Sequence, residues 1–196
     1  MVIDGLPQEL RGLRVTPSLF RVLRVSPALG RSFTDREGDP GGGSPIVLSH
    51  GLWQSMFGGD PAALGRTIRL GWTGEPYTVV GVMPAGFRFF DAGPDGHASG
   101  TRGNQFWIPL VLTPEQKADS ARTRYGFFHV GRLKPGATLA ALQAELDALR
   151  ERNGERFPQF RYDELGMLAG DTAQDALTRG VRRTLCCSGR APPSSC

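Results

Sequence analysis

The stretch from Pro45 to Phe90 constrains the fold more than any other, because turn and cap residues divide it into short elements. Pro45 to Leu48 is a short apolar run between turn residues, which is typical of a buried strand. Ser49 is placed to cap a helix that follows, and Gly58 and Gly59 end it where glycine tolerates a positive φ. The apolar positions of this helix are Leu52, Trp53, Met56 and Phe57. These residues specify a scaffold and supply almost no reactive group.

The same stretch predicts a β-hairpin after the helix. Asp60 and Pro61 restart a short helical piece that runs to Leu64. Thr67 to Leu70 and Tyr77 to Val82 are rich in β-formers and are separated by glycines and a proline. Two such runs around a turn are typical of paired antiparallel strands.

Three segments of the chain resemble, in the same order, the MacB-like periplasmic core domain, which is the extracytoplasmic part of a family of ABC transporter permeases. The segments are VTPSLFRVLRVSPALGRSFT, then VLSHGLWQSMFGGDPAALGRTIRLGWTGEPYTVVGVMP, then FWIPL together with GRLKPGATLAALQAELDAL. They extend over roughly Leu10 to Phe157. One departure is Arg24, which stands where the family usually has a glycine.

The resemblance implies an α+β fold with short strands and helices in two small α/β lobes. A porter-like lobe would comprise residues 1–30 and 126–170, and a second lobe, residues 31–125, would be inserted into it. The first strand of the porter-like lobe would lie upstream of Met1, so we expect this lobe to be incomplete. Residues 171–196 are expected to be a disordered tail, because Arg, Ser, Pro, Gly and Cys bury little apolar surface.

The resemblance also implies one transmembrane helix before this domain and three after it. The longest apolar runs here fall far short of the roughly 20 residues that a spanning helix needs. The chain is therefore expected to be a fragment, without a signal peptide or a transmembrane helix. Its cysteines, Cys186, Cys187 and Cys196, all lie in the tail, where we interpret them as incidental residues in preference to a metal site. A frameshift near Leu185 is our hypothesis for this tail.

Charge excludes a nucleic-acid-binding protein. The net charge is +4, and four of the 23 basic residues lie beyond Asp175, the last acidic residue. The body then balances 19 basic against 19 acidic residues, so the basic character belongs to the tail. A nucleic-acid protein would instead show a basic stripe on a folded face.

Further elements follow from caps and spacing outside the central stretch. Leu10 to Val15 predicts a strand, Pro17 to Val25 a helical turn, and Thr34 to Ser44 a polar, glycine-rich loop. Thr113 starts a short helix with Pro114 at its first position, and Phe127 to Leu133 predicts another strand.

The clearest helix is expected after Thr138, its predicted cap, with Asn153 and Gly154 ending it. Its leucines form one stripe: Leu139, Leu142, Leu146 and Leu149. A stripe this narrow fits a coiled-coil seam or packing on a sheet, and we favour the sheet because three turns are too short to stand alone.

The sequence offers few candidates for chemistry. Ser49 and His50 are the only adjacent nucleophile and base, but the G-x-S-x-G elbow is absent and Ser49 serves as a cap. His97 lies in a glycine-rich loop and His129 in the predicted strand, and their spacing fits no metal motif. We therefore predict no catalytic, cofactor-binding or metal residues.

Two more candidate sites are weighed and set aside. The acidic loop residues Asp35, Glu37 and Asp39 resemble a calcium loop, but the closing glutamate is missing, because Ile46 stands there. The chain has no phosphate-binding glycine motif, so ATP hydrolysis must belong to another polypeptide.

One of the three tryptophans is a candidate for an exposed interaction surface. Trp53 and Trp107 lie in apolar patterns and are expected in the core. Trp72 lies in the hairpin turn, either folded back over the hairpin or exposed as an interface residue.

The predicted function is a non-enzymatic extracytoplasmic domain of an ABC-type export permease, on the periplasmic side of the bacterial inner membrane. It would couple ATPase-driven motion of the membrane helices to the handling of a substrate or adaptor, and it needs no cofactor. The implied partners are the membrane helices of the full permease, a separate ABC ATPase subunit, and a periplasmic adaptor or outer-membrane channel, with dimerisation through the membrane part. The alternatives are a free-standing extracytoplasmic binding or adaptor module and, third, a hydrolase built on Ser49 and His50.

Overall fold

A computed structural model describes residues 2–3, 6–7, 10–70, 74–87, 89, 103–121 and 129–160 of the chain. Its strands are β1 (Val2–Ile3), β2 (Leu6–Pro7), β3 (Gly12–Val15), β4 (Leu29–Gly30), β5 (Pro45–Leu48), β6 (Thr67–Arg69), β7 (Pro76–Val82) and β8 (Phe106–Pro109). Its α-helices are α1 (Leu19–Leu23), α2 (His50–Phe57), α3 (Pro114–Lys117) and α4 (Leu139–Arg156). Short 3₁₀ helices are η1 (Asp35–Gly38), η2 (Pro61–Ala63), η3 (Asp119–Ala121) and η4 (Pro158–Phe160).

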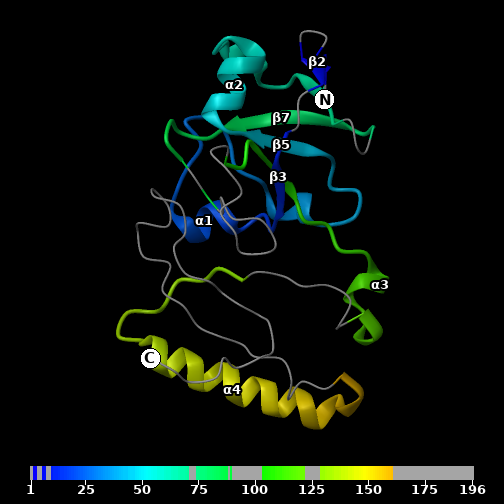
Figure 1. Cartoon of the computed structure of the whole chain (residues 1–196), viewed down its shortest axis with the longest axis vertical. Helices are drawn as coiled ribbons and strands as arrows, with labels where there is room; N and C mark the ends of the chain where they lie inside the picture. Colours follow the sequence, from blue (N-terminus) through cyan, green and yellow to red (C-terminus); the bar gives the residue numbers. More distant parts are fainter. Residues whose placement is uncertain are drawn as a thin grey trace, which may run out of the picture.

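A six-stranded mixed sheet organises the molecule (Figure 1). The strand order is β3-β8-β5-β7-β4, and β6 pairs with β7. The β3–β8 and β5–β7 pairs are parallel, whereas β5–β8, β4–β7 and β6–β7 are antiparallel. This combination of a mixed sheet with separate helices confirms the predicted α+β class, and the β6–β7 pair is the predicted hairpin.

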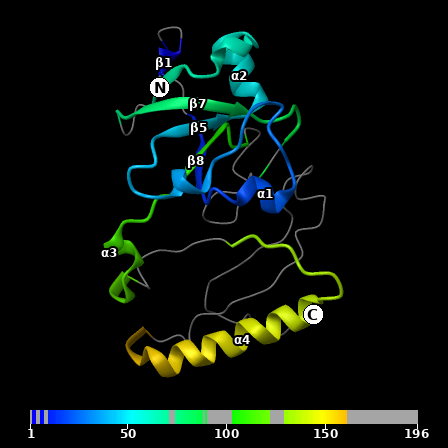
Figure 2. The same cartoon turned by 180° about the vertical axis from the view of Figure 1, so that it is seen from behind.

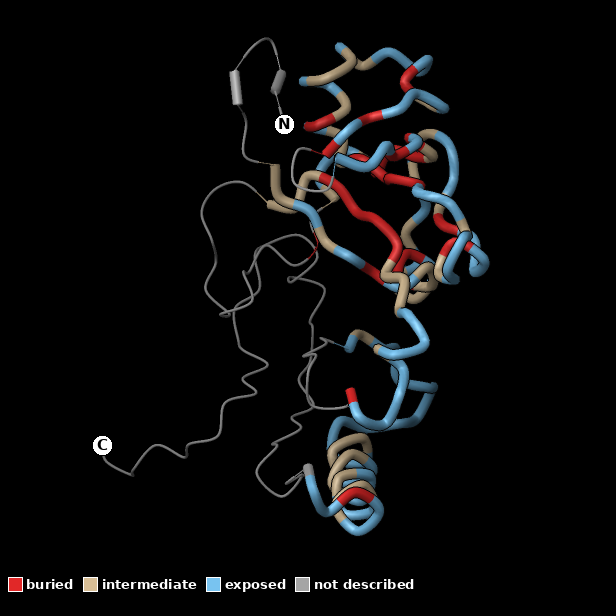
Figure 3. The backbone as a smooth tube through the Cα atoms, turned by 90° about the vertical axis from the view of Figure 1, so that its right-hand side faces the viewer, coloured by how far each residue is buried: buried red, intermediate tan, exposed pale blue. Residues whose placement is uncertain are grey.

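The two central strands are buried on both faces, because their side chains alternate between two apolar clusters. From β5, Ile46 and Leu48 enter the cluster that also holds Leu52 of α2. Val47, between them, enters the opposite cluster with Phe20 of α1. From β8, Trp107 lies in this second cluster and is fully buried. Helices α2 and α1 lie on opposite sides of the sheet, and the buried residues gather between them (Figures 1 and 3).

Several predicted caps are confirmed. The Ser49 hydroxyl accepts a hydrogen bond from the Leu52 backbone N–H at 3.1 Å, and α2 ends at Gly58 with φ at 60°. Asp60 accepts from the Ala62 backbone N–H at 2.8 Å, and so caps η2. The Thr113 hydroxyl accepts from the Gln116 backbone N–H at 3.3 Å.

Three sequence predictions are wrong in the described part of the chain. Residues 129–133 are irregular and form no strand. Helix α4 runs through Asn153 and Gly154 to Arg156, because each of these residues costs only about 1 kcal/mol or less in a helix interior. The predicted loop Thr34 to Ser44 is wrong only at η1 (Asp35–Gly38), which is helical and includes the buried Glu37.

Helix α4 is also packed differently from the prediction. It lies at the opposite end of the molecule from α2 (Figures 1 and 2). None of its residues is buried by the described residues, and Leu139 and Leu149 are 37% and 41% exposed. Within the described residues, the leucine stripe of α4 therefore does not pack on the sheet as predicted.

The division into two lobes stays a prediction. Strands β3 and β4 belong to the predicted porter-like lobe, residues 1–30 and 126–170. They pair with β8 and β7 of the predicted second lobe, residues 31–125, so both predicted lobes contribute strands to one sheet. Residues 171–196, the predicted tail, lie outside the described residues. No helix in the described ranges is both long and apolar enough to span a membrane.

Candidate functional site

Ser49 and His50 are used by the scaffold. The Ser49 hydroxyl caps α2, and the His50 ring packs edge-on against Trp53 with ring centroids 5.4 Å apart. Both residues are half-buried, and no hydrogen bond joins them in the part of the chain that the structure describes. The arrangement lacks the contact between nucleophile and base that a hydrolase requires.

The acidic residues proposed for a calcium loop, Asp35, Glu37 and Asp39, do not gather into a metal-binding site, and two of them form ion pairs. Asp35 pairs with Arg21 at 3.0 Å on the surface. Glu37 is 7% exposed and accepts two hydrogen bonds from the Arg31 guanidinium, at 2.8 and 3.0 Å. It also accepts one from the Thr34 backbone N–H at 2.6 Å. These contacts anchor η1 to the chain next to β4.

Burial raises the pKa of Glu37, but the hydrogen bonds from Arg31 and Thr34 outweigh it and hold the pKa below its ordinary value. The same pair raises the pKa of Arg31, chiefly through its hydrogen bond to Glu37. Both groups are therefore kept charged. A carboxylate held in this way is a structural anchor and has no proton to exchange near neutral pH.

The remaining predicted candidates are dispersed or not described. His129 is exposed, in an irregular segment. His97, Trp72 and the three cysteines lie outside the described residues. Among the residues that are described, no group of three or more metal-ligating side chains comes together.

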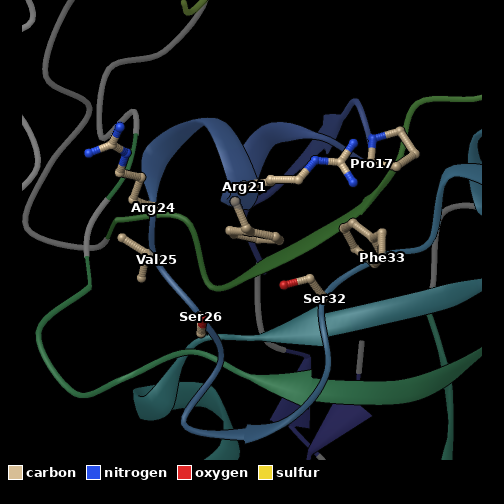
Figure 4. A pocket seen from close by; sticks show the side chains of 8 residues that line it. Pro17, Arg21, Arg24, Val25, Ser26, Ser32 and Phe33 are labelled. Atoms are coloured by element: carbon tan, nitrogen blue, oxygen red, sulfur yellow. The ribbon is translucent and has the colours of Figure 1, made fainter. Parts of the chain in front are cut away.

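A cleft of about 400 Å³ lies between α1 and the segment that leads through β4 to η1 (Figure 4). Arg21 and Arg24 flank it from α1 and its C-terminal end, and Ser26 and Ser32 lie across from them. The rest of the lining is apolar and comes from Pro17, Phe20, Val25 and Phe33. The cleft presents cationic and hydroxyl groups at its rim, and the Phe20 and Phe33 rings behind them are buried.

The backbone at Arg24 is unusual. Arg24 caps the C-terminus of α1 in the left-handed conformation, with φ at 56° and ψ at 36°. It is the one non-glycine residue with a positive φ in the described ranges. This geometry explains why glycine suits the position, since an L-residue with a Cβ is disfavoured there.

Sequence reasoning missed both the buried ion pair and the cleft. The pattern of Thr34 followed three residues later by Glu37 is a helix-start signature that marks η1. No local sequence pattern marks the cleft. Its lining residues precede α1, lie within α1 and follow it as far as Phe33, and they share no motif.

Comparisons with known proteins return one family model and a solved structure. A family model, the MacB-like periplasmic core domain, matches residues 3–149. A crystal structure from Porphyromonas gingivalis, described as a domain of a permease, matches with 18% sequence identity and a TM-score of 0.45. The match covers 76% of this chain and 62% of that structure, which is less than two thirds of its length. No curated protein matches the chain.

The family model extends over the whole described sheet from β3 to β8 and most of α4. The chain belongs to the family of MacB-like periplasmic core domains.

Proposed function

We propose that this chain is the extracytoplasmic part of an ABC-type export permease and acts without catalysis. It would couple ATP-driven motion of the membrane helices to the handling of a substrate or an adaptor. The observation that carries the proposal is the family match over residues 3–149. The coupling role is an inference from that family, in which the domain is part of a permease.

The packing of the sheet supports a mechanical role. An element that transmits motion must resist deformation, and densely packed interiors do so. Clusters on both faces enclose β5 and β8, whose residues are all buried. The bidentate Arg31–Glu37 pair then fixes η1 beside this sheet.

The proposed setting is the periplasmic side of the bacterial inner membrane. The proposed partners are the membrane helices of the permease, a separate ABC ATPase subunit, and a periplasmic adaptor or outer-membrane channel. Dimerisation would occur through the membrane part.

Transport by the complete permease tests the coupling. The permease and its ATPase subunit are reconstituted in vesicles, and export and ATP hydrolysis are measured with and without the segment from β3 to α4. We expect ATP hydrolysis to persist and export to be lost in the shortened permease. Undiminished export would overturn the proposal.

The hydrolase alternative has its own test. The 196-residue chain is expected to hydrolyse no generic ester. Turnover that disappears in Ser49→Ala would replace the non-enzymatic proposal with a catalytic one.

A free-standing binding or adaptor module is the second candidate, and the cleft beside α1 is the observation that favours it. Such a module would bind its partner without any membrane segment. Capture of a purified periplasmic adaptor by the 196-residue chain alone would favour this candidate. Capture that requires the complete permease would favour the first.

A further inference from the structure

Helix α4 carries an apolar stripe that the sheet region does not cover. Leu139 and Leu149 are 37% and 41% exposed, and Leu142 and Leu146 between them are half-buried. Neither of the two core clusters in the described part of the chain includes a residue of α4. Leucines on one face of a helix contribute free energy only when another apolar surface covers them.

The spacing of the stripe is that of a coiled-coil seam. The four leucines follow one another at intervals of three, four and three residues, so they occupy positions a, d, a and d of two heptads. Asn153 takes the next a position, where an asparagine fixes the register of a two-stranded coiled coil. The seam ends there, because Arg156 at the following d position lies over the ring of Phe157, 4.9 Å from its centroid. The pattern therefore fits a second helix with the same spacing.

The charges beside the seam favour a second copy of this chain in parallel orientation. Glu145 lies at a g position, and Arg150 lies at the e position five residues later. In a parallel pair, the g position of one helix faces the following e position of the other. Glu145 of each copy would therefore meet Arg150 of the other. Within its own helix Arg150 makes only a 3.9 Å contact with Asp147, which leaves it able to turn to a partner.

An antiparallel pair fits the same residues less well. If leucines face leucines, the midpoint of the pair falls at Ala144, and Glu145 lies beside its own copy. If the two helices overlap along their whole length instead, Leu139 faces Arg156. The first arrangement places like charges together, and the second places leucine against a charge. Of these arrangements, the parallel one aligns all four leucine layers and also pairs opposite charges.

We infer that α4 is an interaction surface for a second copy of this chain, and that two α4 helices associate in parallel from Leu139 to Asn153 as a short coiled coil. Because the seam is only two heptads long, its association should be weak and reversible, with a Kd of roughly 0.1–1 mM. The inference does not rest on the proposed transport function, and the isolated chain is sufficient to test it.

Sedimentation equilibrium of the 196-residue chain, in the presence of a reductant, tests the association. The reductant prevents Cys186, Cys187 and Cys196 from linking two chains. We expect a reversible monomer–dimer equilibrium, and Leu146→Ala should weaken it at least about tenfold, because each copy loses a leucine from the seam while alanine keeps the helix. A chain that stays monomeric up to about 1 mM, or a dimer that Leu146→Ala leaves unchanged, would overturn the inference.

Charge reversal tests the orientation. Glu145→Arg and Arg150→Glu should each weaken self-association by about tenfold, because two attractive contacts become repulsive. Mixed in equal amounts, the two variants should form a heterodimer about as tight as the parent dimer, since every g–e contact again joins opposite charges. A mixture that associates no better than either variant alone would contradict the parallel arrangement.

Glu151→Arg is the matched control for Glu145→Arg. Both variants change the net charge by the same amount, but Glu151 is exposed at an f position, away from the seam. The Kd of the dimer should therefore be unchanged in Glu151→Arg. Equal weakening by the two variants would show that net charge alone controls association, and would contradict the proposed surface.

Discussion

The sheet region, residues 10–87 and 103–109 as far as they are described, and the α4 region, residues 129–160, start from similar local signals and end in different packing. Each contains a helix with a side-chain cap: Ser49 caps α2, and the Thr138 hydroxyl accepts from the Ala141 backbone N–H at 3.1 Å. Yet Leu52 of α2 is 2% exposed, whereas Leu149 of α4 is 41% exposed. Similar caps therefore accompany very different burial.

The difference lies in what covers each helix. Helix α2 is short, eight residues, and its apolar side faces strands that are buried on both faces. Helix α4 is longer, eighteen residues, and none of them is buried by the described residues. Caps and propensity set where a helix begins, and tertiary contacts set how much free energy its burial contributes.

Trp107→Ala should give the largest loss in the sheet region. Trp107 is fully buried and touches Phe20 and Phe87 edge-on, so its truncation should lower the free energy of unfolding by about 3–5 kcal/mol. Trp53→Ala is the matched control. Because Trp53 is only half-buried, with its indole N–H bound to the Asp60 carbonyl oxygen at 2.9 Å, we expect a loss of about 1–2 kcal/mol.

Urea unfolding of both variants measures this contrast. Equal losses would show that Trp53, which the sequence pattern places in the core, is as well packed as Trp107.

A leucine pair compares the two regions directly. Leu52→Ala should lower the free energy of unfolding by about 2–5 kcal/mol, because the side chain leaves a cavity between α2 and the sheet. Leu149→Ala should change it by no more than about 0.5 kcal/mol, since the residue is largely exposed. Denaturant midpoints provide the measurement, and a Leu149→Ala loss above about 2 kcal/mol would mean that α4 is buried as deeply as α2.

The sequence was most informative where the signal is local. The strand Pro45–Leu48, the cap at Ser49, the turn at Gly58 and the hairpin that ends with Val82 are all confirmed. Each depends on residues that lie within a few positions of one another. The order of strands in the sheet could not be derived in this way, because β3 and β8 are separated by about ninety residues.

The candidate cleft was less predictable than the fold. Arg24 could be recognised as unusual only through the resemblance to a family that has glycine there. Its geometry, and the approach of Ser32 to α1, depend on how the segment after α1 returns along β4. Such a site is assembled by tertiary structure from residues that carry no motif of their own.

The Arg31–Glu37 pair tests whether the sheet region depends on polar anchors as well as on apolar packing. Arg31→Ala leaves the buried carboxylate of Glu37 without its bidentate partner, so we expect a loss of about 2–3 kcal/mol. Arg150, which lies 3.9 Å from Asp147 on α4, provides the comparison, and Arg150→Ala should change stability by less than about 1 kcal/mol.

The same pair predicts a pH dependence. Because the Glu37 pKa is lowered on folding, the stabilisation is fully present above the ordinary glutamate pKa and is lost as pH falls through the lowered value. Melting temperatures measured from neutral to acid pH should fall less steeply in Glu37→Gln than in the parent. Parallel curves would show that Glu37 does not contribute to acid unfolding.

Small effects are also expected from the two helix caps, and they bear most directly on the comparison. Ser49→Ala and Thr138→Ala each remove one hydrogen bond to a helix N-terminus, which costs about 1 kcal/mol. Because α2 is packed on the sheet, Ser49→Ala should lower the stability of the whole sheet region. Thr138→Ala should instead speed amide exchange only within α4, whose residues are not buried by the described chain. Hydrogen exchange resolved by residue separates these outcomes, and faster exchange of β5 amides in Thr138→Ala would show that α4 and the sheet unfold together.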